Sequence, residues 1–162
     1  MTDIPAEVRE RRLSELAESS PDALWCVGDD GVITWLNHTA IRLGADIGDG
    51  GRLVELLDGP SASRFTDEAL PAARHNGSWS GEFVLRSAGR TFPVAARVVA
   101  HAPQGAVGWE FSIVARDVSS ERQASALLRD QARRDALTGL PNRPEFLERL
   151  AHALHASRTR GT

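Results

Sequence analysis

The segment Ala23–Val27 constrains the fold most, because it is a short run of apolar residues that ends at an acidic turn. The turn, Asp29-Asp30-Gly31, leads directly into a second β-rich segment, Val32–Leu36. Two such segments joined by an Asp-Gly turn predict a β-hairpin. An unbroken apolar strand also predicts cover on both of its faces, since a strand with one wet face alternates apolar and polar residues.

A helix is predicted just before this hairpin, over residues 5–19. Pro5 suits the first turn of a helix, and Leu13, Leu16 and Ala17 fall on one stripe at helical spacing. This helix is the natural candidate to cover the second face of the apolar strand, either from the same chain or from a second copy.

Strand signals vanish between residues 37 and 76, where three helical segments are predicted, and three further strands follow. The helices are His38–Leu43, Leu53–Leu57 and Ala62–His75, the last interrupted near Pro71; the strands are Ser80–Arg86, Thr91–His101 and Val107–Arg116. This order predicts an α+β fold, with a five-stranded antiparallel sheet, helices on one face of it, and flanking helices at both ends.

The C-terminal residues predict two helices separated by a turn. Ser120–Gln123 matches a capping box, so a helix is expected from there to about residue 136. It ends there because Gly139 and Pro141 break the helical pattern. Asn142 is predicted to cap a second helix, with Glu145 three residues later.

Composition excludes several classes of protein. The 162 residues carry 19 basic and 22 acidic side chains, a net charge of −3, which is too small for nucleic-acid or membrane-surface binding on charge alone. No apolar run approaches the ~18 residues of a membrane helix, and the N-terminus lacks the apolar core of a signal peptide. Cys26 is the sole cysteine, so an internal disulfide is impossible. We therefore expect a soluble, cytoplasmic protein with no nucleic-acid or membrane partner.

Two stretches resemble parts of a PAS domain. Ser20–Gly44, SPDALWCVGDDGVITWLNHTAIRLG, resembles its start: an apolar strand, an acidic-Gly turn, a strand ending in Asn37, and a helix. Trp79–Val118, with WSGEFVLRSAGRTFPVAARVVAH and GWEFSIVARDV, is similar to the three C-terminal PAS strands. Arg116–Ser119 occupies the place of the family's D-I-T motif, where the last strand passes into the signalling helix. The resemblance covers about residues 20–119 and implies a sensory domain.

A second resemblance begins at Asp135. The string Asp135–Arg143, DALTGLPNR, matches the opening of GGDEF domains, the diguanylate cyclases that condense two GTP into cyclic di-GMP. The GGDEF signature and the strand with the first metal-binding aspartate are absent from the sequence, so the resemblance implies only a truncated start of that domain. We therefore expect no catalytic residue and no enzyme activity in this chain. We expect the parent protein to be a diguanylate cyclase or a GGDEF–EAL hybrid.

The resemblances divide the chain into four parts: a flanking helix (1–19), a PAS domain (20–119), a connector helix (120–136) and the start of a GGDEF domain (137–162). They imply a regulatory module that dimerises and relays a signal through the connector to a cyclase output. The alternative is a ligand-free PAS module that serves in protein interaction or dimerisation and senses nothing.

The resemblance implies that a PAS module could hold haem, flavin or a small metabolite between its sheet and its helices. The candidate pocket residues are Trp35, Asn37, Phe83, Trp109 and Phe111. Trp35, Trp79 and Trp109 have rings that could border a flavin, although tryptophan is also ordinary core material. Asn37 has a second interpretation, that of a local cap where the strand turns into the helix.

The cofactor is left unassigned, with none, flavin or haem as the choices. Haem needs an axial ligand, usually a histidine on the long helix, but His75 stands directly before Asn76-Gly77, which predicts an exposed helix end. The photoactive flavin branch needs a reactive cysteine beside the first short helix, whereas Cys26 lies in the first strand, where a small buried thiol is the ordinary interpretation. His152 and His155 are too few for a structural metal site, so no metal is predicted.

Asp117, Ser120 and Leu128 are the residues predicted to relay a signal into the connector helix. The connector carries a weak seam, formed by Ala124, Leu128, Gln131 and Asp135, which suits a switch between two registers better than a static zipper. The alternative is a solvated linker helix. We expect a homodimer through residues 5–19 and 120–136, with the outer face of the sheet contributing.

Overall fold

A computed structural model describes residues 5–44, 47, 50–103, 108–133, 140, 142–143, 145–147 and 150. The chain divides into two compact units, Met1–Ser119 and Ser120–Thr162. The first unit contains one sheet and the helices packed on it, and the second contains most of helix α5 (Ser119–Arg133).

The sheet has five antiparallel strands in the order β2-β1-β5-β4-β3. The strands are β1 (Ala23–Gly28), β2 (Ile33–Leu36), β3 (Ser78–Ser87), β4 (Arg90–His101) and β5 (Glu110–Asp117). The first and last strands lie side by side in the middle of the sheet, with Ala23 opposite Ala115. The predicted hairpin, the three later strands and the α+β class are confirmed.

The tight turn between β3 and β4 follows from two residues with positive φ. Ala88 has φ 47° and Gly89 has φ 74°, and Ser87 pairs with Arg90 on either side of them. Two central residues with positive φ make the type I′ turn, whose twist matches that of the strands it joins.

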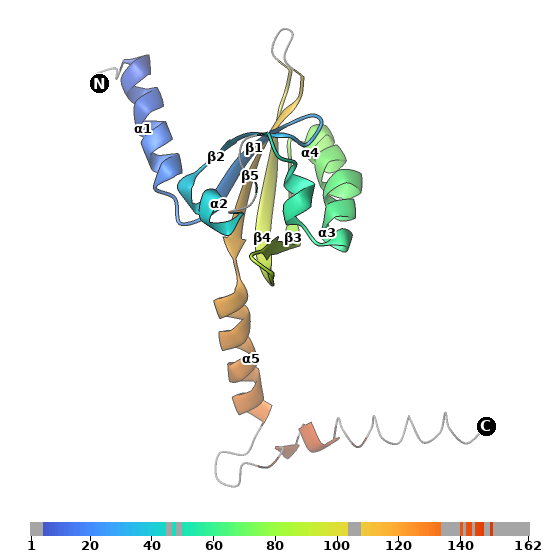
Figure 1. Cartoon of the computed structure of the whole chain (residues 1–162). Helices are drawn as coiled ribbons and strands as arrows, with labels where there is room; N and C mark the ends of the chain where they lie inside the picture. Colours follow the sequence, from blue (N-terminus) through green and yellow to red (C-terminus); the bar gives the residue numbers. More distant parts are fainter. Residues whose placement is uncertain are drawn as a thin grey trace, which may run out of the picture. The chain divides into compact units, whose positions relative to one another are not determined.

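Four helical segments pack against one face of the sheet (Figure 1). They are α2 (His38–Leu43), the 3₁₀ helix η1 (Leu53–Leu56), α3 (Gly59–Arg64) running through a π-helical turn, Phe65–Ala69, and α4 (Leu70–Asn76). The predicted interruption near Pro71 is confirmed as this π turn, in which the Leu70 amide donates to the Phe65 carbonyl. Pro71 has no amide hydrogen, so an α-helical bond is missing at this point and the wider turn accommodates the loss.

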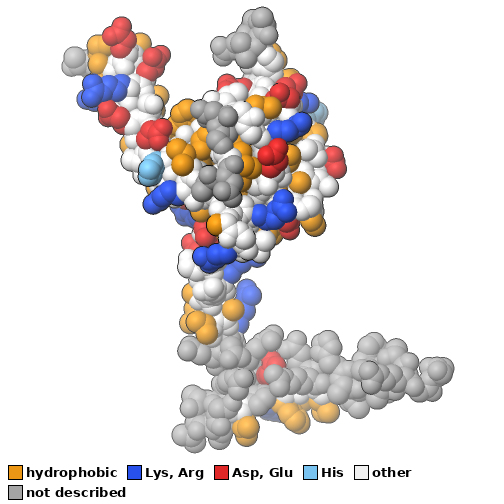
Figure 2. Space-filling view, in the orientation of Figure 1, with side chains coloured by type: hydrophobic (Ala, Val, Ile, Leu, Met, Phe, Trp, Pro, Cys, Tyr) orange, Lys and Arg blue, Asp and Glu red, His pale blue; other side chains and the backbone are white. Residues whose placement is uncertain are grey.

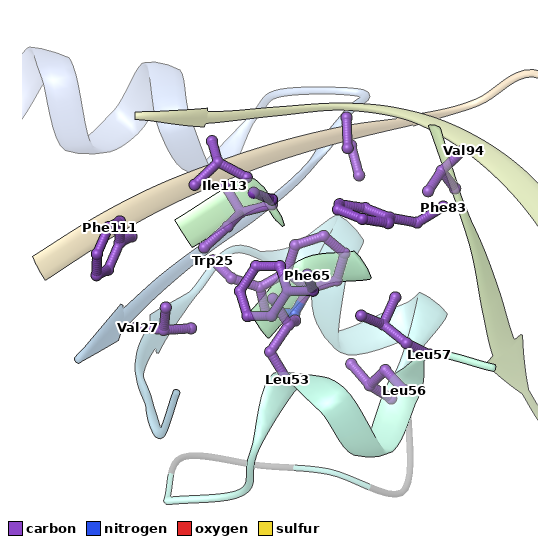
Figure 3. Packing of buried hydrophobic residues seen from close by; sticks show 14 of the residues in the cluster. Trp25, Val27, Leu53, Leu56, Leu57, Phe65, Phe83, Val94, Phe111 and Ile113 are labelled. Carbon is purple, nitrogen blue, oxygen red and sulfur yellow. The ribbon is translucent and has the colours of Figure 1, made fainter. Parts of the chain in front are cut away.

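The core lies between the sheet and these helices (Figure 3). Phe65 is fully buried at its centre, and its ring meets that of Phe83 edge to face at 5.9 Å between centroids. Trp25, Val27 and Ile113 line the sheet side of the cluster. Buried and less buried residues alternate along the last strand, in which Phe111, Ile113 and Ala115 are all buried.

Trp79 of strand β3 connects this strand to the π turn. Its indole stacks on Phe83 at 5.0 Å, and its Nε1 donates to Glu68 Oε1 at 3.0 Å. Hydrogen bonds from Arg64 and from this indole hold the pKa of Glu68 below its usual value. The Arg64 guanidinium lies 5.2 Å from the centre of the Trp79 ring. The indole crosses directly over Gly81, where a Cβ atom would overlap its six-membered ring.

Replacing Gly81 by alanine should therefore destabilise the domain. The added methyl group forces Trp79 out of its stack on Phe83, and overpacking of this kind costs about 1–3 kcal/mol. Gly59→Ala is the matched control, because a Cβ at Gly59 meets nothing within 4 Å and its φ is not positive. That variant should be neutral or up to about 1 kcal/mol more stable. Urea denaturation followed by tryptophan fluorescence measures both, and equal stabilities would contradict this role of Trp79.

The N-terminal helix α1 (Ala6–Glu18) forms as predicted but buries none of its residues. Leu13 and Leu16 are 59% and 66% exposed. The expectation that this helix covers β1 within one chain is therefore wrong, and cover from a second copy stays a prediction. Leu24 and Cys26 on the outer face of β1 are half-buried.

The C-terminal part differs from expectation at one point. Helix α5 begins at Ser119, so Ser120 lies inside the helix and is not its cap. The cap at Asn142 is confirmed, since its Oδ1 accepts a hydrogen bond from the Glu145 amide at 3.1 Å. Asp135, Gly139, Pro141 and residues 151–162 lie outside the described residues. Within the part of the chain that the structure describes, no helix has the length and apolar character needed to cross a membrane.

Candidate functional site

The side chain of Asn37 is fully buried where β2 turns into α2, and all of its hydrogen-bonding groups are used by the chain itself. Its Oδ1 accepts from the amides of Leu24 at 3.0 Å and Ala40 at 2.9 Å. Its Nδ2 donates to the carbonyls of Ala17 at 2.9 Å and Asp22 at 3.0 Å. The carboxamide therefore ties the end of α1, the linker into β1 and the start of α2 together. The local-cap interpretation is confirmed, and the placement of Asn37 in a ligand pocket is wrong, since no group remains for a ligand.

Asp22 connects the residues around Asn37 to the end of the last strand. Arg116 donates from Nε to Asp22 Oδ1 at 3.0 Å and from a terminal nitrogen to Oδ2 at 3.3 Å. This is the two-point geometry that makes an arginine–carboxylate pair directional. Since Ala23 lies opposite Ala115, the pairing of β1 with β5 places these two charges at the same end of the sheet.

Asp117 holds the passage from β5 into α5. Its Oδ1 accepts from the Ser119 amide at 2.8 Å, and the Val118 amide donates to the Pro93 carbonyl at 3.1 Å. The first bond satisfies an amide at the start of the helix, and the second ties the same turn to strand β4. Ser120 bonds only locally, through Oγ to Glu121 Oε2 at 2.9 Å, and Leu128 is 66% exposed.

These contacts form one path from the end of α1 to the start of α5. It runs from Ala17 through Asn37 and Asp22 to Arg116, which is next to Asp117 in β5. We call these four residues the junction: Asp22, Asn37, Arg116 and Asp117. The junction is therefore the candidate functional site for relaying a signal.

The other pocket candidates do not meet in one cavity. Phe83 and Phe111 are buried in the core, on strands separated by β4. Trp109 is half-buried just before β5, with its ring 6.4 Å from that of Phe111. Trp35 pairs with Cys26 in register, so it lies on the outer face, away from the helices. The pairing register separates Trp35 from the other three residues, which lie in or beside the core, so one ligand site does not include all four.

The cofactor candidates show no site of the expected kind. His75 is exposed at the end of α4, next to the left-handed Gly77. Cys26 lies on the outer face, 3.7 Å from Ser112 Oγ, which in turn lies 2.8 Å from His101 Nε2. Burial raises the pKa of the Cys26 thiol, so it stays protonated at neutral pH. Among the described residues, no His, Cys, Asp and Glu side chains gather in a group able to hold a metal ion.

One hollow that the sequence did not point to opens at the β1–β2 turn. It has a volume of about 240 Å³ and lies between that turn, η1 and the π turn with the start of α4. Asp29, Arg52, Phe65 and Arg74 are among its lining residues. They come from separate segments, so no local motif marks them.

Solved structures with the same arrangement of strands and helices are PAS domains. The PAS domain of a protein from Colwellia psychrerythraea has a TM-score of 0.62 and 17% identity, covering 70% of this chain and 98% of that one. The chain has the PAS fold. A PAS domain from a two-component sensor histidine kinase gives a TM-score of 0.55 and 17% identity, covering 70% of this chain and 99% of its own.

A third similar structure is an RNA-binding light-oxygen-voltage receptor, with a TM-score of 0.61 and 16% identity over 82% of this chain and 40% of the receptor. At these identities the likeness shows the fold alone. No family model matches the sequence, and no curated protein matches it significantly.

Replacing Asp117 by alanine should loosen the passage from β5 into α5 and leave the sheet folded. The lost hydrogen bond to the Ser119 amide should cost about 1–2 kcal/mol. Hydrogen exchange should accelerate over residues 118–130, as read by mass spectrometry. Asp117→Asn keeps the accepting oxygen and should behave like the parent chain, as should Ser120→Ala. Unchanged melting temperature together with unchanged exchange in 118–130 would refute a role for Asp117 at this passage.

Proposed function

We propose that the chain is the sensory and regulatory module of a cyclic di-GMP signalling protein. It dimerises and relays a signal through α5 to a GGDEF diguanylate cyclase output. The observation that carries the proposal is the junction, because Arg116 pairs with Asp22 while Asp117 holds the start of α5. Input from α1 and output through α5 are thereby joined at one end of a PAS sheet.

The GGDEF assignment rests on the string Asp135–Arg143 and on its position in the chain, shortly after the helix that follows the PAS sheet. Helix α5 leaves β5 directly and runs to Arg133, so the string follows the helix without a further domain between them. Asn142, which belongs to this string, caps the next helical segment by accepting a hydrogen bond from the Glu145 amide.

The dimer is proposed because both flanking helices carry exposed leucines. Leu127 and Leu128 of α5 are each 66% exposed, and hydrophobic side chains gather on one side of this helix (Figure 2). Leu13 and Leu16 are exposed on α1. A fully buried leucine is worth about 1.5–3 kcal/mol, so several brought together across a two-fold axis can sustain a symmetric dimer. In the proposed dimer the outer face of the sheet borders the helices.

Sedimentation of the full chain tests this arrangement. The chain should run as a dimer at tens of micromolar, and the double variant Leu127→Gln/Leu128→Gln should weaken the dimer at least ~10-fold, since each leucine loses its burial. Arg122→Gln is the control, because it changes an exposed residue that helical spacing places away from both leucines, and it should leave the dimer intact. A monomeric parent chain, or a double variant that dimerises as tightly as the parent, would show that α5 is not the contact.

In this proposal the chain relays a signal and catalyses nothing. Phosphoryl transfer needs carboxylate-held metal ions and groups that neutralise phosphate charge. The described residues contain no such cluster. Incubation with GTP and magnesium should therefore yield no cyclic di-GMP by mass spectrometry, with protein free of host cyclase. A cyclase of known activity, assayed in parallel, is the positive control, and product formed by the purified chain would overturn the proposal.

A ligand-free interaction module is the second candidate. It is favoured by the filled interior, where Phe65, Phe83 and Trp25 occupy the space between sheet and helices (Figure 3). Ligand binding measured on the purified chain decides between the sensory module and the ligand-free module, because the ligand-free module dimerises without responding to any small molecule.

A further inference from the structure

The hollow at the β1–β2 turn has walls that are fixed by the chain's own bonds. Arg52 donates to the Asp30 carbonyl at 2.7 Å, and the Leu53 amide donates to the Gly31 carbonyl at 3.1 Å. The Val32 amide donates to Asp30 Oδ1 at 3.0 Å. These bonds hold the turn against the segment before η1, so the hollow is formed before any ligand arrives.

Its rim carries charges of both signs. Asp29 and Asp30 lie on the turn, with Arg52 on the facing segment and Arg74 on α4. Arg74 forms an ion pair with Asp29 across the opening. Two carboxylates and two guanidiniums cancel in net charge, so the rim favours neither a simple anion nor a simple cation. It complements a molecule that carries one charge of each sign.

The floor of the hollow is apolar. Phe65 is fully buried, Leu70 is nearly so, and Val54 is half-buried; all three line the hollow. Its volume of about 240 Å³ is below the ~300–1,000 Å³ of pockets for drug-sized ligands. The space therefore suits a small molecule with one short hydrocarbon group.

We propose that this hollow binds a free α-amino acid with a short aliphatic side chain. The inference rests on the proposed sensory function and names the class of signal. The ligand carboxylate accepts hydrogen bonds from Arg74 and Arg52, and each guanidinium has five donors, so its bond to the chain leaves others for the ligand. The ammonium group donates to the carboxylates of Asp29 and Asp30. The side chain rests on Phe65 and Leu70.

Binding there reaches the output strand through Arg74. The guanidinium of Arg74 lies 5.4 Å from the centre of the Phe111 ring, while it also pairs with Asp29. A ligand that bonds to Arg74 and Asp29 weakens the ion pair between α4 and the β1–β2 turn. The Arg74 guanidinium is also in contact with Phe111 of β5, so this change reaches that strand. Strand β5 continues to Asp117 and the start of α5.

Isothermal titration calorimetry on the full chain tests the proposal with L-alanine, L-valine and L-leucine. At least one of them should bind. Two analogues of leucine separate its charges: 4-methylpentanoate lacks the ammonium group, and 3-methylbutylamine lacks the carboxylate. Each analogue should bind at least ~10-fold more weakly than leucine, because each loses hydrogen bonds between charged groups, which are stronger than hydrogen bonds between neutral groups. An analogue that binds as tightly as the amino acid, or no binding by any of the three at ~1 mM, would overturn the proposal.

Variants of the rim give the second arm of the test. Arg74→Gln and Asp30→Asn should each weaken binding at least ~10-fold. Asn at position 30 keeps an acceptor for the Val32 amide, so this variant should fold even if the loss of Arg74 destabilises the chain. Arg97→Gln changes an exposed arginine on the other face of the sheet and should bind like the parent. Equal binding by Asp30→Asn and the parent would assign the ligand to another site.

The dimer measurement separates this inference from the proposed function. A chain that dimerises through α5 but binds none of the amino acids retains the proposed relay and loses this ligand class. A chain that binds the amino acid but stays monomeric at tens of micromolar retains the site and loses the dimeric relay.

Discussion

The buried side chain of Asn37 sets how the N-terminal linker, the first strand and helix α2 meet, and the junction is built around it. Leaving one buried polar group unpaired costs about 1–3 kcal/mol, so a side chain at this position must supply one double acceptor and two donors at once. Asn37 does so through four bonds, two of them to the carbonyls of Ala17 and Asp22. Those two bonds fix the linker at the start of β1, where Asp22 pairs with Arg116.

Much of the fold could be predicted from the sequence, because its signals are local. The apolar segment Ala23–Val27 and the Asp-Gly turn specify the hairpin, and α2 begins and ends where its pattern indicates. Pro71 marks a break in the long helix, since a missing amide hydrogen is visible in one residue. The π turn itself is not visible, because it also depends on contacts with strand β3: Phe65 packs on Phe83, and Glu68 accepts a hydrogen bond from Trp79.

The candidate site could be predicted only in part. Asp117 is visible in the sequence because it acts on its neighbour, Ser119. The pair of Asp22 and Arg116 joins residues 94 positions apart, and only the register of β1 on β5 places them together. The predicted aromatic pocket loses Trp35 for the same reason: Trp35 and Phe111 are alike in type, but their registers put them on opposite faces of the sheet. Long-range pairing is not encoded in any short window of sequence.

Two contacts of the junction are exposed, the Arg116–Asp22 pair and the hydrogen bond to Asp117, and they are weak compared with the packing of the core. The proposed relay requires such weak contacts. Arg116 is 62% exposed, and exposed ion pairs are worth about 0–1 kcal/mol. The hydrogen bond that Asp117 accepts from the Ser119 amide adds about 1–2 kcal/mol. In the proposed relay, a signal that favours one state by a few kcal/mol is enough to change these exposed contacts at the start of α5, but it is too small to rearrange the closely packed core around Phe65. In the proposed relay, sensitivity lies at the one end of the sheet where Asp22, Arg116 and Asp117 meet, because the core around Phe65 is too closely packed to adopt a second arrangement.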